Sequence, residues 1–535
     1  MSYFRRLGGL FMTRTLLLIA AAGSAVYAQT ACEQLQSLKL PDTTITMAMT
    51  VAAGAFQNPG APAGPGTPAQ PQGQAKGKQA KGGGAPGAPA APAAQQMLPA
   101  YCRVSATLKP SPDSDIKIEV WLPVGAGWNG KYEAVGGGGW AGVISYPALA
   151  SAVQEGYATS STDTGHEGGN ANFAVGHPEK IVDFSYRAVH EMTVKAKAIM
   201  TAYYGRGPRL SYWNGCSTGG RQGLMEAQRY PEDFDGIVAG APANYQTHLH
   251  AFDMSLQTFV RQAGAAVPVA KSDMVAKAVL ASCDAADGVK DGLLNDPRKC
   301  NFDPGTLLCK GADSNECLTA LQVESVKKAY APLKTSKGDL VYPGYAKGSE
   351  TGWAVLAATT PTPAPLSLGS YREVLHQDPN WDWKTWDVDK DVAAVDEKYG
   401  YINAINPDLS AFKARGGKLI TYHGWADTAI PPENSINYRA TVLGKMGAKQ
   451  DSWYRLFMVP GMGHCGNGAG PNQFNYMGAM ERWRESGTAP EFIIAEHVAN
   501  NKVDMTRPLC AYPQVATYKG VGSTNDAANF SCKAP

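Results

Sequence analysis

The sequence predicts an α/β fold, in which a mostly parallel sheet is covered by helices on both faces. Segments with strand-like patterns alternate with helix-like segments over much of the chain. A Gly-Cys-Ser-Thr-Gly motif at 215–219 stands between a strand-like segment and a helix-like one. Between 246 and 405 this alternation fades into a stretch with four cysteines and many aromatic residues. Together these observations predict an α/β-hydrolase fold with an inserted lid subdomain.

The first 28 residues have the pattern of a signal peptide. Three arginines lie within the first 14 residues, the apolar run Leu16–Ala22 follows, and small residues at 26–28 offer a cleavage site. A membrane anchor is the weaker interpretation, because the run is shorter than the roughly 20 residues of a bilayer span. The pair Arg5-Arg6 also raises a twin-arginine export route. We expect a mature protein that starts near Gln29, is secreted or periplasmic, and has no membrane attachment.

The predicted elements of the catalytic domain lie at 29–245 and 406–535, on both sides of the lid at 246–405. Residues 54–96 interrupt the first part with Ala, Pro, Gly, Gln and Lys, a composition that cannot bury enough apolar surface to fold. We expect a disordered insert there. Strands are predicted at 116–123, 128–135, 210–213, 237–239, 418–422 and 453–459, and helices at 185–204 and 221–229.

Composition and charge favour a globular enzyme with a small-molecule substrate. Of 535 residues, 44% are apolar and 18% are charged, which is enough for a large core. A net charge of +2 leaves no basic field for nucleic acid. The ten cysteines are an even number in a chain predicted to be exported, so disulfides are expected. Zinc is the rival interpretation, but no cysteine or histidine spacing typical of a zinc site occurs.

The motif at 215–219 singles out Ser217 as the candidate nucleophile. In this motif a sharp turn between strand and helix exposes the serine hydroxyl, and small neighbours make the turn possible. A glycine-rich turn without a catalytic part is the alternative. The strand before it and the helix after it favour catalysis.

A catalytic serine needs a base to accept its proton and a carboxylate to orient that base. In this fold the partners follow the serine in the order acid, then histidine. Asp427 comes just after the predicted strand at 418–422, and His464 lies in a glycine-containing loop after the strand at 453–459. Both positions lie beyond the carboxyl ends of strands, where open sheets carry their sites. A single histidine or aspartate in a loop is usually only solvated, but order and placement together favour catalysis.

Two cysteines flank these candidates, since Cys216 precedes Ser217 and Cys465 follows His464. If the serine and histidine are within hydrogen-bonding reach, their neighbours can approach the separation that a disulfide prefers. A bridge between them would hold the base against the nucleophile. Two unrelated structural cysteines are the alternative.

The oxyanion of the tetrahedral intermediate requires hydrogen-bond donors. The backbone N–H of Thr218, which follows the nucleophile, is one candidate. The glycine run at 136–139, directly after a predicted strand, is a candidate source of the other. A flexible turn is the alternative there.

The stretch 283–293 has the composition of a calcium loop, with three aspartates and two glycines. Calcium takes six to eight oxygen ligands, and carboxylates with turn carbonyls can supply them. The spacing is not that of an EF-hand, and surface Asp-Gly turns are the alternative. A Cys283–Cys300 bridge would close this loop, and a Cys32–Cys102 bridge would tie both ends of the insert to the fold.

Four stretches of this chain resemble the tannase and feruloyl esterase family, which includes a bacterial mono(hydroxyethyl) terephthalate hydrolase. The similarity runs from about Cys32 to Cys532 and is weakest in the insert and the lid. The most specific stretches lie at 212–223, 234–242, 422–427 and 459–465.

The resemblance implies a Ser217, Asp427 and His464 triad, oxyanion donors at Gly139 and Thr218, and no organic cofactor. It also implies structural calcium. The implied calcium ligands are the side chains of Asp284, Asp287 and Asp291 and the carbonyls of Val289 and Leu293. The implied disulfides are Cys216–Cys465, Cys32–Cys102, Cys283–Cys300, Cys309–Cys317 and Cys510–Cys532.

Hydrolysis of an aromatic carboxylic ester, of the feruloyl or galloyl type, is the function that the sequence favours. The lid departs from the terephthalate enzyme, and the stretch 378–383 looks more like feruloyl esterases, so a terephthalate half-ester is the alternative substrate. Arg372, Trp381 and Trp383 are the candidate substrate contacts in the lid. A secreted serine peptidase, or a binding protein without catalysis on the same fold, are further alternatives. The oligomeric state is left open.

Overall fold

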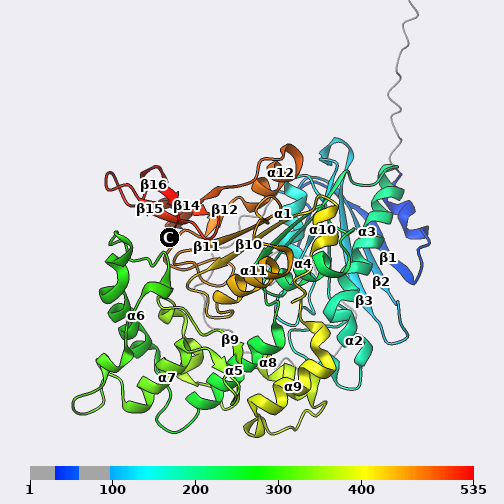
Figure 1. The fold of residues 1–535 in the computed structure, drawn as a ribbon. Helices are drawn as coiled ribbons and strands as arrows, with labels where there is room; N and C mark the ends of the chain where they lie inside the picture. Colours follow the sequence, from blue (N-terminus) through cyan, green and yellow to red (C-terminus); the bar gives the residue numbers. More distant parts are fainter. Residues whose placement is uncertain (1–29, 59–96, 535) are drawn as a thin grey trace, which may run out of the picture.

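The computed structural model describes residues 30–58 and 97–534. The predicted signal peptide at 1–28 and most of the predicted insert, 59–96, lie outside the described residues. Within the described residues, nine strands form the central sheet in the order β1-β2-β3-β5-β4-β6-β7-β10-β11 (Figure 1). Their bounds are β1 (Thr43–Val51), β2 (Tyr101–Leu108), β3 (Ile116–Pro123), β4 (Lys131–Val135), β5 (Ala158–Thr162), β6 (Leu210–Cys216), β7 (Gly236–Gly240), β10 (Lys418–Gly424) and β11 (Tyr454–Val459).

The sheet is antiparallel from β1 to β5 and parallel from β5 to β11. Its central strands are buried on both faces, as parallel strands covered by helices must be. In β6, for example, Tyr212 and Trp213 are both fully buried and belong to the cores of opposite faces. The same alternation continues in Ile237 and Val238 of β7.

Helices cover both faces of this sheet (Figure 1). One face packs against helices α3, α4, α10 and α11, and the other packs against α1 and α12. The predicted helix at 185–204 begins as a π-helical turn, Asp183–Arg187, before α3 continues it. The bounds are α1 (Tyr146–Gln154), α2 (Pro178–Val182), α3 (Ala188–Tyr204), α4 (Thr218–Arg229), α10 (Ser410–Ala414), α11 (Glu433–Met446) and α12 (Tyr476–Ser486).

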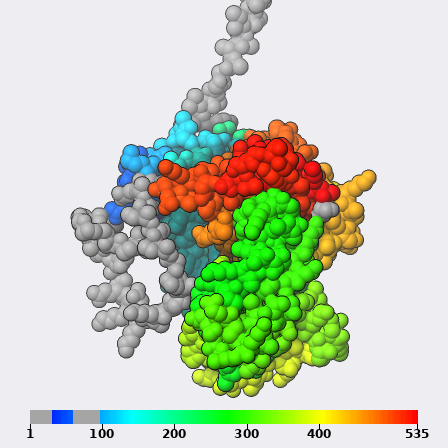
Figure 2. All heavy atoms as spheres, turned by 90° about the vertical axis from the view of Figure 1, so that its left-hand side faces the viewer, coloured from blue at the N-terminus to red at the C-terminus, as the bar shows by residue number. Residues whose placement is uncertain are grey.

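The lid lies below the carboxyl-terminal half of the sheet in Figure 1, and in Figure 2 it forms the green lower front of the molecule. It starts with α5, whose first residue is Gln246, and has a hydrophobic core of its own around Phe252, Val279 and Trp353. Its elements are α5 (Gln246–Val260), α6 (Val269–Cys283), α7 (Ala320–Tyr330), β8 (Leu333–Lys334), β9 (Leu340–Tyr342), α8 (Pro365–Gly369) and α9 (Val388–Tyr399). The observed architecture is therefore the predicted α/β-hydrolase fold with an inserted lid.

Two small antiparallel sheets lie at the carboxyl-terminal end of the chain, and the sequence patterns did not predict them. They consist of β12 (Gln473–Phe474), β13 (Phe492–Ala499) and β14 (Lys502–Cys510), and of β15 (Val515–Tyr518) and β16 (Phe530–Lys533). Val289 of the lid packs into the core of the second sheet, and Asn295 donates a hydrogen bond to the carbonyl of Ala516 at 3.2 Å. In Figure 2 this red segment rests on the upper end of the green lid.

Five disulfides cross-link the described chain, and none of its cysteines is free. The pairs are those that the resemblance implies: Cys32–Cys102, Cys216–Cys465, Cys283–Cys300, Cys309–Cys317 and Cys510–Cys532. The first joins η1 (Cys32–Ser37) to β2, on the two sides of residues 59–96. In the described part of the chain, no helix combines the length and the apolar character that crossing a bilayer would require.

Candidate active site

Ser217 occupies a strained turn between β6 and α4. Its backbone has φ 65° and ψ −124°, a conformation that a residue with a side chain rarely adopts. The turn is tight because the backbone segments around it lie very close together. A Cβ atom on Gly215 would lie 2.7 Å from the backbone of Gly219, and a Cβ atom on Gly136 would lie 2.5 Å from the same backbone. Ser217 N–H donates to the carbonyl of Gly240 at 3.0 Å. Strand, turn and helix thus hold the serine where the motif predicts.

Asp427 and His464 are joined by a hydrogen bond. The Nδ1 atom of His464 lies 2.8 Å from Oδ2 of Asp427, whose side chain is fully buried, while the imidazole remains partly exposed. The other carboxylate oxygen, Oδ1, accepts the N–H groups of Ala429 and Ile430 at 2.8 and 2.9 Å. Since Nδ1 must carry a proton to donate to a carboxylate, Nε2 of His464 is left free as an acceptor.

Electrostatics keep the carboxylate charged and strengthen the base. Burial alone would raise the pKa of Asp427, but His464 and His423 together bring it well below the ordinary value. For His464, burial lowers the pKa and the charge of Asp427 more than offsets this, so the pKa is raised. An oriented imidazole with a raised pKa beside an ionised carboxylate is suited to general-base catalysis.

His423 is a residue near the site whose role the sequence did not reveal. It is fully buried at the end of β10, with Nε2 at 3.2 Å from Oδ2 of Asp427 and at 2.9 Å from the carbonyl of Ile430. Its Nδ1 lies 2.7 Å from the hydroxyl of Ser435. Because a carbonyl can only accept, Nε2 of His423 carries a proton and can share it with Asp427. The only signal in the sequence is the four-residue spacing to Asp427, which is too common to be specific.

The Cys216–Cys465 disulfide connects the turn of the candidate nucleophile, Ser217, to the loop that carries His464. The two Cα atoms lie 5.9 Å apart, although 249 positions separate the residues in sequence. Ser217 and His464 are the immediate chain neighbours of this bridge. Within the described residues the Ser217 hydroxyl has no hydrogen-bond partner, and contacts of this kind often tighten only when substrate binds.

The glycine run at 136–139 folds over the start of α4. The hydroxyl of Thr218 donates to the carbonyl of Gly139 at 2.6 Å, and Gly137 N–H donates to the side chain of Gln222 at 3.1 Å. Gly139 has φ 58°, which favours glycine. Its N–H makes no hydrogen bond in the described structure, and the N–H of Thr218, as the first residue of α4, has no acceptor within the helix. These two donors are therefore available to an oxyanion.

The predicted calcium loop is a compact turn on the lid, closed by Cys283–Cys300. Asp284 accepts the N–H groups of residues 291 and 292, and Asp287 accepts those of residues 289 and 295. Asp291 accepts the N–H of residue 293 and an ion pair from buried Arg507 at 2.8 Å. The three carboxylates thus lie in one short loop, with a guanidinium beside Asp291, and each keeps acceptor capacity for a cation. The donor set is that of a hard metal such as calcium.

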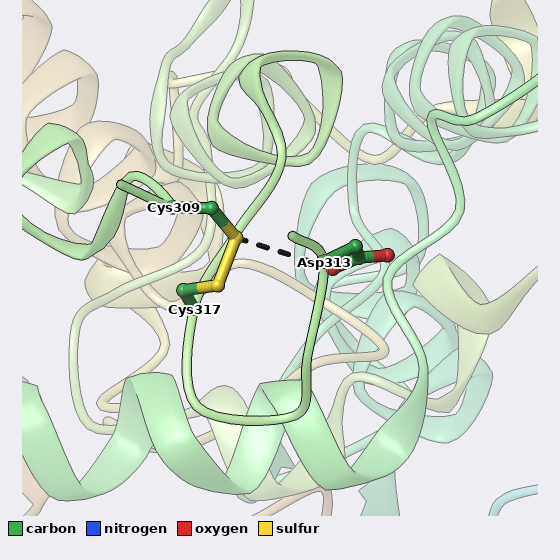
Figure 3. Close-up of side chains that lie close together, drawn as sticks. All are labelled: Cys309, Asp313 and Cys317. Carbon is green, nitrogen blue, oxygen red and sulfur yellow. Dashed lines mark hydrogen bonds between the residues drawn. A yellow bond between two sulfur atoms is a disulfide. The ribbon is translucent and has the colours of Figure 1, made fainter. Parts of the chain in front are cut away.

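Two other groups in the described residues bring possible ligand atoms within 4.8 Å of one another, and the calcium loop is not among them. One is Cys309, Asp313 and Cys317, but Figure 3 shows that the sulfurs are bonded to each other, so no thiolate is available. The other is His190, Glu226 and Asp233, in which Asp233 already binds His190 at 2.7 Å. Burial and the neighbouring charge of Asp233 raise the pKa of Glu226 well above its ordinary value, which favours a neutral acid.

The predicted lid contacts are engaged within the lid. The guanidinium of Arg372 lies 2.7 Å from the carboxylate of Glu373, so an anionic substrate would have to compete with this pair. Trp381 stacks on His376 with ring centres 4.4 Å apart, and Trp383 packs at the edge of the core between α5, α8 and α9. No interaction among the described residues joins these three to the candidate triad.

The family of the chain follows from comparison with known proteins. The family model described as "Tannase and feruloyl esterase" matches residues 102–533. The chain belongs to this family. An uncharacterized esterase of Xanthomonas campestris is 37% identical over 582 residues, covering 98% of this chain and 95% of the relative. A probable feruloyl esterase B-2 of Aspergillus terreus is 36% identical over 465 residues, covering 82% and 87%.

Solved structures of the tannase and feruloyl esterase family agree with the fold. Feruloyl esterase B from Aspergillus oryzae superposes with a TM-score of 0.83 at 30% identity and covers 94% of this chain and 99% of that one. Tannin acyl hydrolase from Aspergillus niger superposes with a TM-score of 0.74 at 24% identity, covering 93% of each chain. The chain is thus a carboxylic ester hydrolase of this family.

Proposed function

We propose that this protein is a secreted serine esterase that hydrolyses aromatic carboxylic esters of the feruloyl or galloyl type through an acyl-enzyme. The observation that carries the proposal is the His464–Asp427 hydrogen bond, located at the loop that a disulfide ties to the Ser217 turn. The names of the relatives support the choice of an aromatic ester.

In the proposed mechanism the Ser217 hydroxyl attacks the ester carbonyl while Nε2 of His464 takes its proton. The N–H groups of Gly139 and Thr218 donate to the oxyanion of the tetrahedral intermediate. His464 then gives the proton to the departing alcohol, which leaves Ser217 acylated. A water deprotonated by the same imidazole attacks the acyl group, and the acid is released. Asp427 stays ionised and keeps the imidazole in the tautomer that exposes Nε2 to the serine.

Labelling with a fluorophosphonate tests the nucleophile, because this probe reacts covalently with activated serines. The wild-type protein should be labelled and Ser217→Ala should not, while Ser336→Ala, which alters an exposed lid serine, provides the control. Labelling of Ser217→Ala at the wild-type rate would show that another residue is the nucleophile. Turnover of feruloyl, galloyl and terephthaloyl methyl esters would then rank the substrates, with matched amides to detect a peptidase.

Calcium and export complete the proposal. Asp284, Asp287 and Asp291, with the carbonyls of Val289 and Leu293, would hold a structural calcium ion in the lid loop, which packs against the carboxyl-terminal sheet. The ion would neutralise the excess negative charge of this loop and would take no part in the reaction.

The five disulfides support export, since such bonds persist in oxidising compartments. Detection of the processed protein outside the cytoplasm would test this.

A further inference from the structure

A cavity lies on the face of the central sheet that α1 and α12 cover. Its volume is about 520 Å³, which is in the range of cavities that bind small molecules. Residues within or next to α1, β4, β6, β12, β13 and α12 line it. In Figure 1 these two helices lie at the top of the molecule, and the lid lies at the bottom. The described lining residues include no member of the candidate triad, the oxyanion donors or the lid, so the cavity is a separate site.

Three carboxylates line this cavity, which we call the glutamate cavity. They belong to Glu133 of β4, Glu155 at the end of α1 and Glu496 of β13. None of the lining residues that the structure describes is a lysine, an arginine or a histidine. Lys131, two residues before Glu133 on the same strand, is paired with two other glutamates, both on α12. The glutamate cavity therefore carries an excess of negative charge.

Glu133 is the buried member of the three. Only 4% of this residue is exposed, and its Oε1 atom accepts a hydrogen bond from the side chain of Asn214 at 2.9 Å. Its other oxygen, Oε2, makes no hydrogen bond with any described residue. Burial, opposed by the bond from Asn214, raises the pKa of Glu133 to about 7, and the charges of Glu155 and Glu481 add to the rise. Buried carboxylate oxygens normally have partners, so Oε2 at the wall of a cavity is open to a ligand.

Two aromatic rings form another part of the wall. The rings of Phe474 and Tyr476 have centres 5.6 Å apart, and their planes meet at 76°. Tyr422, which does not line the cavity, stacks on Tyr476 at 5.3 Å and meets Phe474 edge-on at 5.1 Å. This stack covers one face of the Tyr476 ring and leaves the other face for a ligand. Because aromatic faces attract cations, such rings beside carboxylates are suited to an ammonium group.

A metal ion and a neutral sugar fit these walls less well. Among the described residues, the three carboxylates are not one of the groups whose ligand atoms lie within 4.8 Å of one another, so they cannot share one ion. A sugar could bond to the amides of Gln473 and Asn475, but it would leave the buried carboxylate of Glu133 without a counter-charge. An organic cation satisfies both the carboxylates and the rings.

We propose that the glutamate cavity binds an organic ammonium ion, with Glu133 as its ion-pair partner and Phe474 and Tyr476 as its aromatic contacts. This site is separate from the proposed esterase site, and its test requires no turnover.

Calorimetric titration with choline tests this site. The control ligand is the neutral carbon analogue of choline, in which a tert-butyl group replaces the trimethylammonium group without changing its shape. Wild-type protein should bind choline at least about tenfold more tightly than the neutral analogue. Glu133→Gln keeps the size and the acceptor for Asn214 but removes the charge, and it should raise the Kd of choline at least about tenfold. Phe474→Leu removes one ring and should raise this Kd about threefold.

The matched control is Glu397→Gln, the same replacement at an exposed glutamate of α9, which should keep the wild-type Kd. If Glu133→Gln does not fold, Glu496→Gln at an exposed position of β13 takes its place, with an expected rise in Kd of about threefold.

Three results would overturn the inference. The first is that wild-type protein binds choline and its neutral analogue equally, or binds neither. The second is that choline binds with the same Kd to the wild type, to the charge variant and to Phe474→Leu, which would place the cation elsewhere. The third is that xylotriose binds and choline does not, which would make the cavity a sugar site. None of these results depends on whether Ser217 hydrolyses esters.

Discussion

Removing the Cys216–Cys465 disulfide should weaken both the fold and the catalysis of this enzyme. The bridge closes a loop of 249 positions. On the chain-entropy description, opening such a loop costs about 5.5 kcal/mol of stability, whereas opening the eight-position loop of Cys309–Cys317 costs about 2.5 kcal/mol. Cys216→Ala/Cys465→Ala should therefore lose about 3 kcal/mol more than Cys309→Ala/Cys317→Ala, which serves as the control.

Catalysis provides the sharper readout of the same perturbation. Ser217 and His464 are attached directly to the two ends of the bridge, and a misplacement of about 1 Å can reduce the rate of a reaction about 100-fold. We expect kcat for an aromatic methyl ester to fall at least about tenfold in Cys216→Ala/Cys465→Ala and to stay at the wild-type level in the control. This loss of kcat should be present at temperatures below the onset of unfolding, where the variant is folded.

Urea unfolding under non-reducing conditions measures the first effect, and initial rates at a temperature where all variants are folded measure the second. A variant that lost stability but kept the wild-type kcat would refute the idea that the bridge positions the base. The bridge would then be a structural cross-link that happens to lie beside the site.

Further predictions concern the residues around Asp427 and the calcium loop. Because only a neutral imidazole can accept the serine proton, kcat/KM should rise with pH through the pKa of His464, which Asp427 raises above its ordinary value. Asp427→Asn should move this rise to lower pH, since burial then acts alone on His464, and should reduce kcat by about 10⁴-fold; a pH–rate profile that did not move would contradict the pairing. His423→Phe should lower kcat about tenfold, and His423→Gln should lower it less, because only glutamine can still donate a hydrogen bond to Asp427. Equal losses in the two variants would show that the size of the side chain matters and the hydrogen bond does not. Chelation of calcium should destabilise the protein by about 2.7 kcal/mol if the ion was present at a hundredfold over Kd, and Asp287→Asn should abolish the response; a melting curve unchanged by chelator would remove the metal site.

Local patterns were sufficient to predict the strands and turns that carry the candidate triad. The strand-turn-helix context around Ser217 follows from apolar runs and glycines that are neighbours in sequence. The positions of Asp427 and His464 follow from the rule that parallel strands end at one edge of a sheet, and β10 and β11 do end side by side. β3 spans the predicted 116–123, whereas α4 begins three residues before the predicted start, because the turn at the serine leads directly into the helix.

Tertiary packing decided which side chains contact one another, and the periodicity of apolar residues in the sequence does not encode these contacts. His423 has a role only because β10 brings it against Asp427, and Arg372 is occupied by Glu373, which a sequence shows only as an adjacent charge. The carboxyl-terminal sheets were not predicted from strand patterns, and the second of them packs against Val289 of the lid.

The sequence by itself determined the fold and predicted the turn of the candidate nucleophile and the order of its candidate partners, because those depend on local patterns and on one edge of one sheet. Only the folded chain decided whether His464 reaches Asp427 and whether the Cys216–Cys465 bridge forms, and both contacts are present. Such contacts depend on segments that lie far apart in sequence, and no local pattern carries that information.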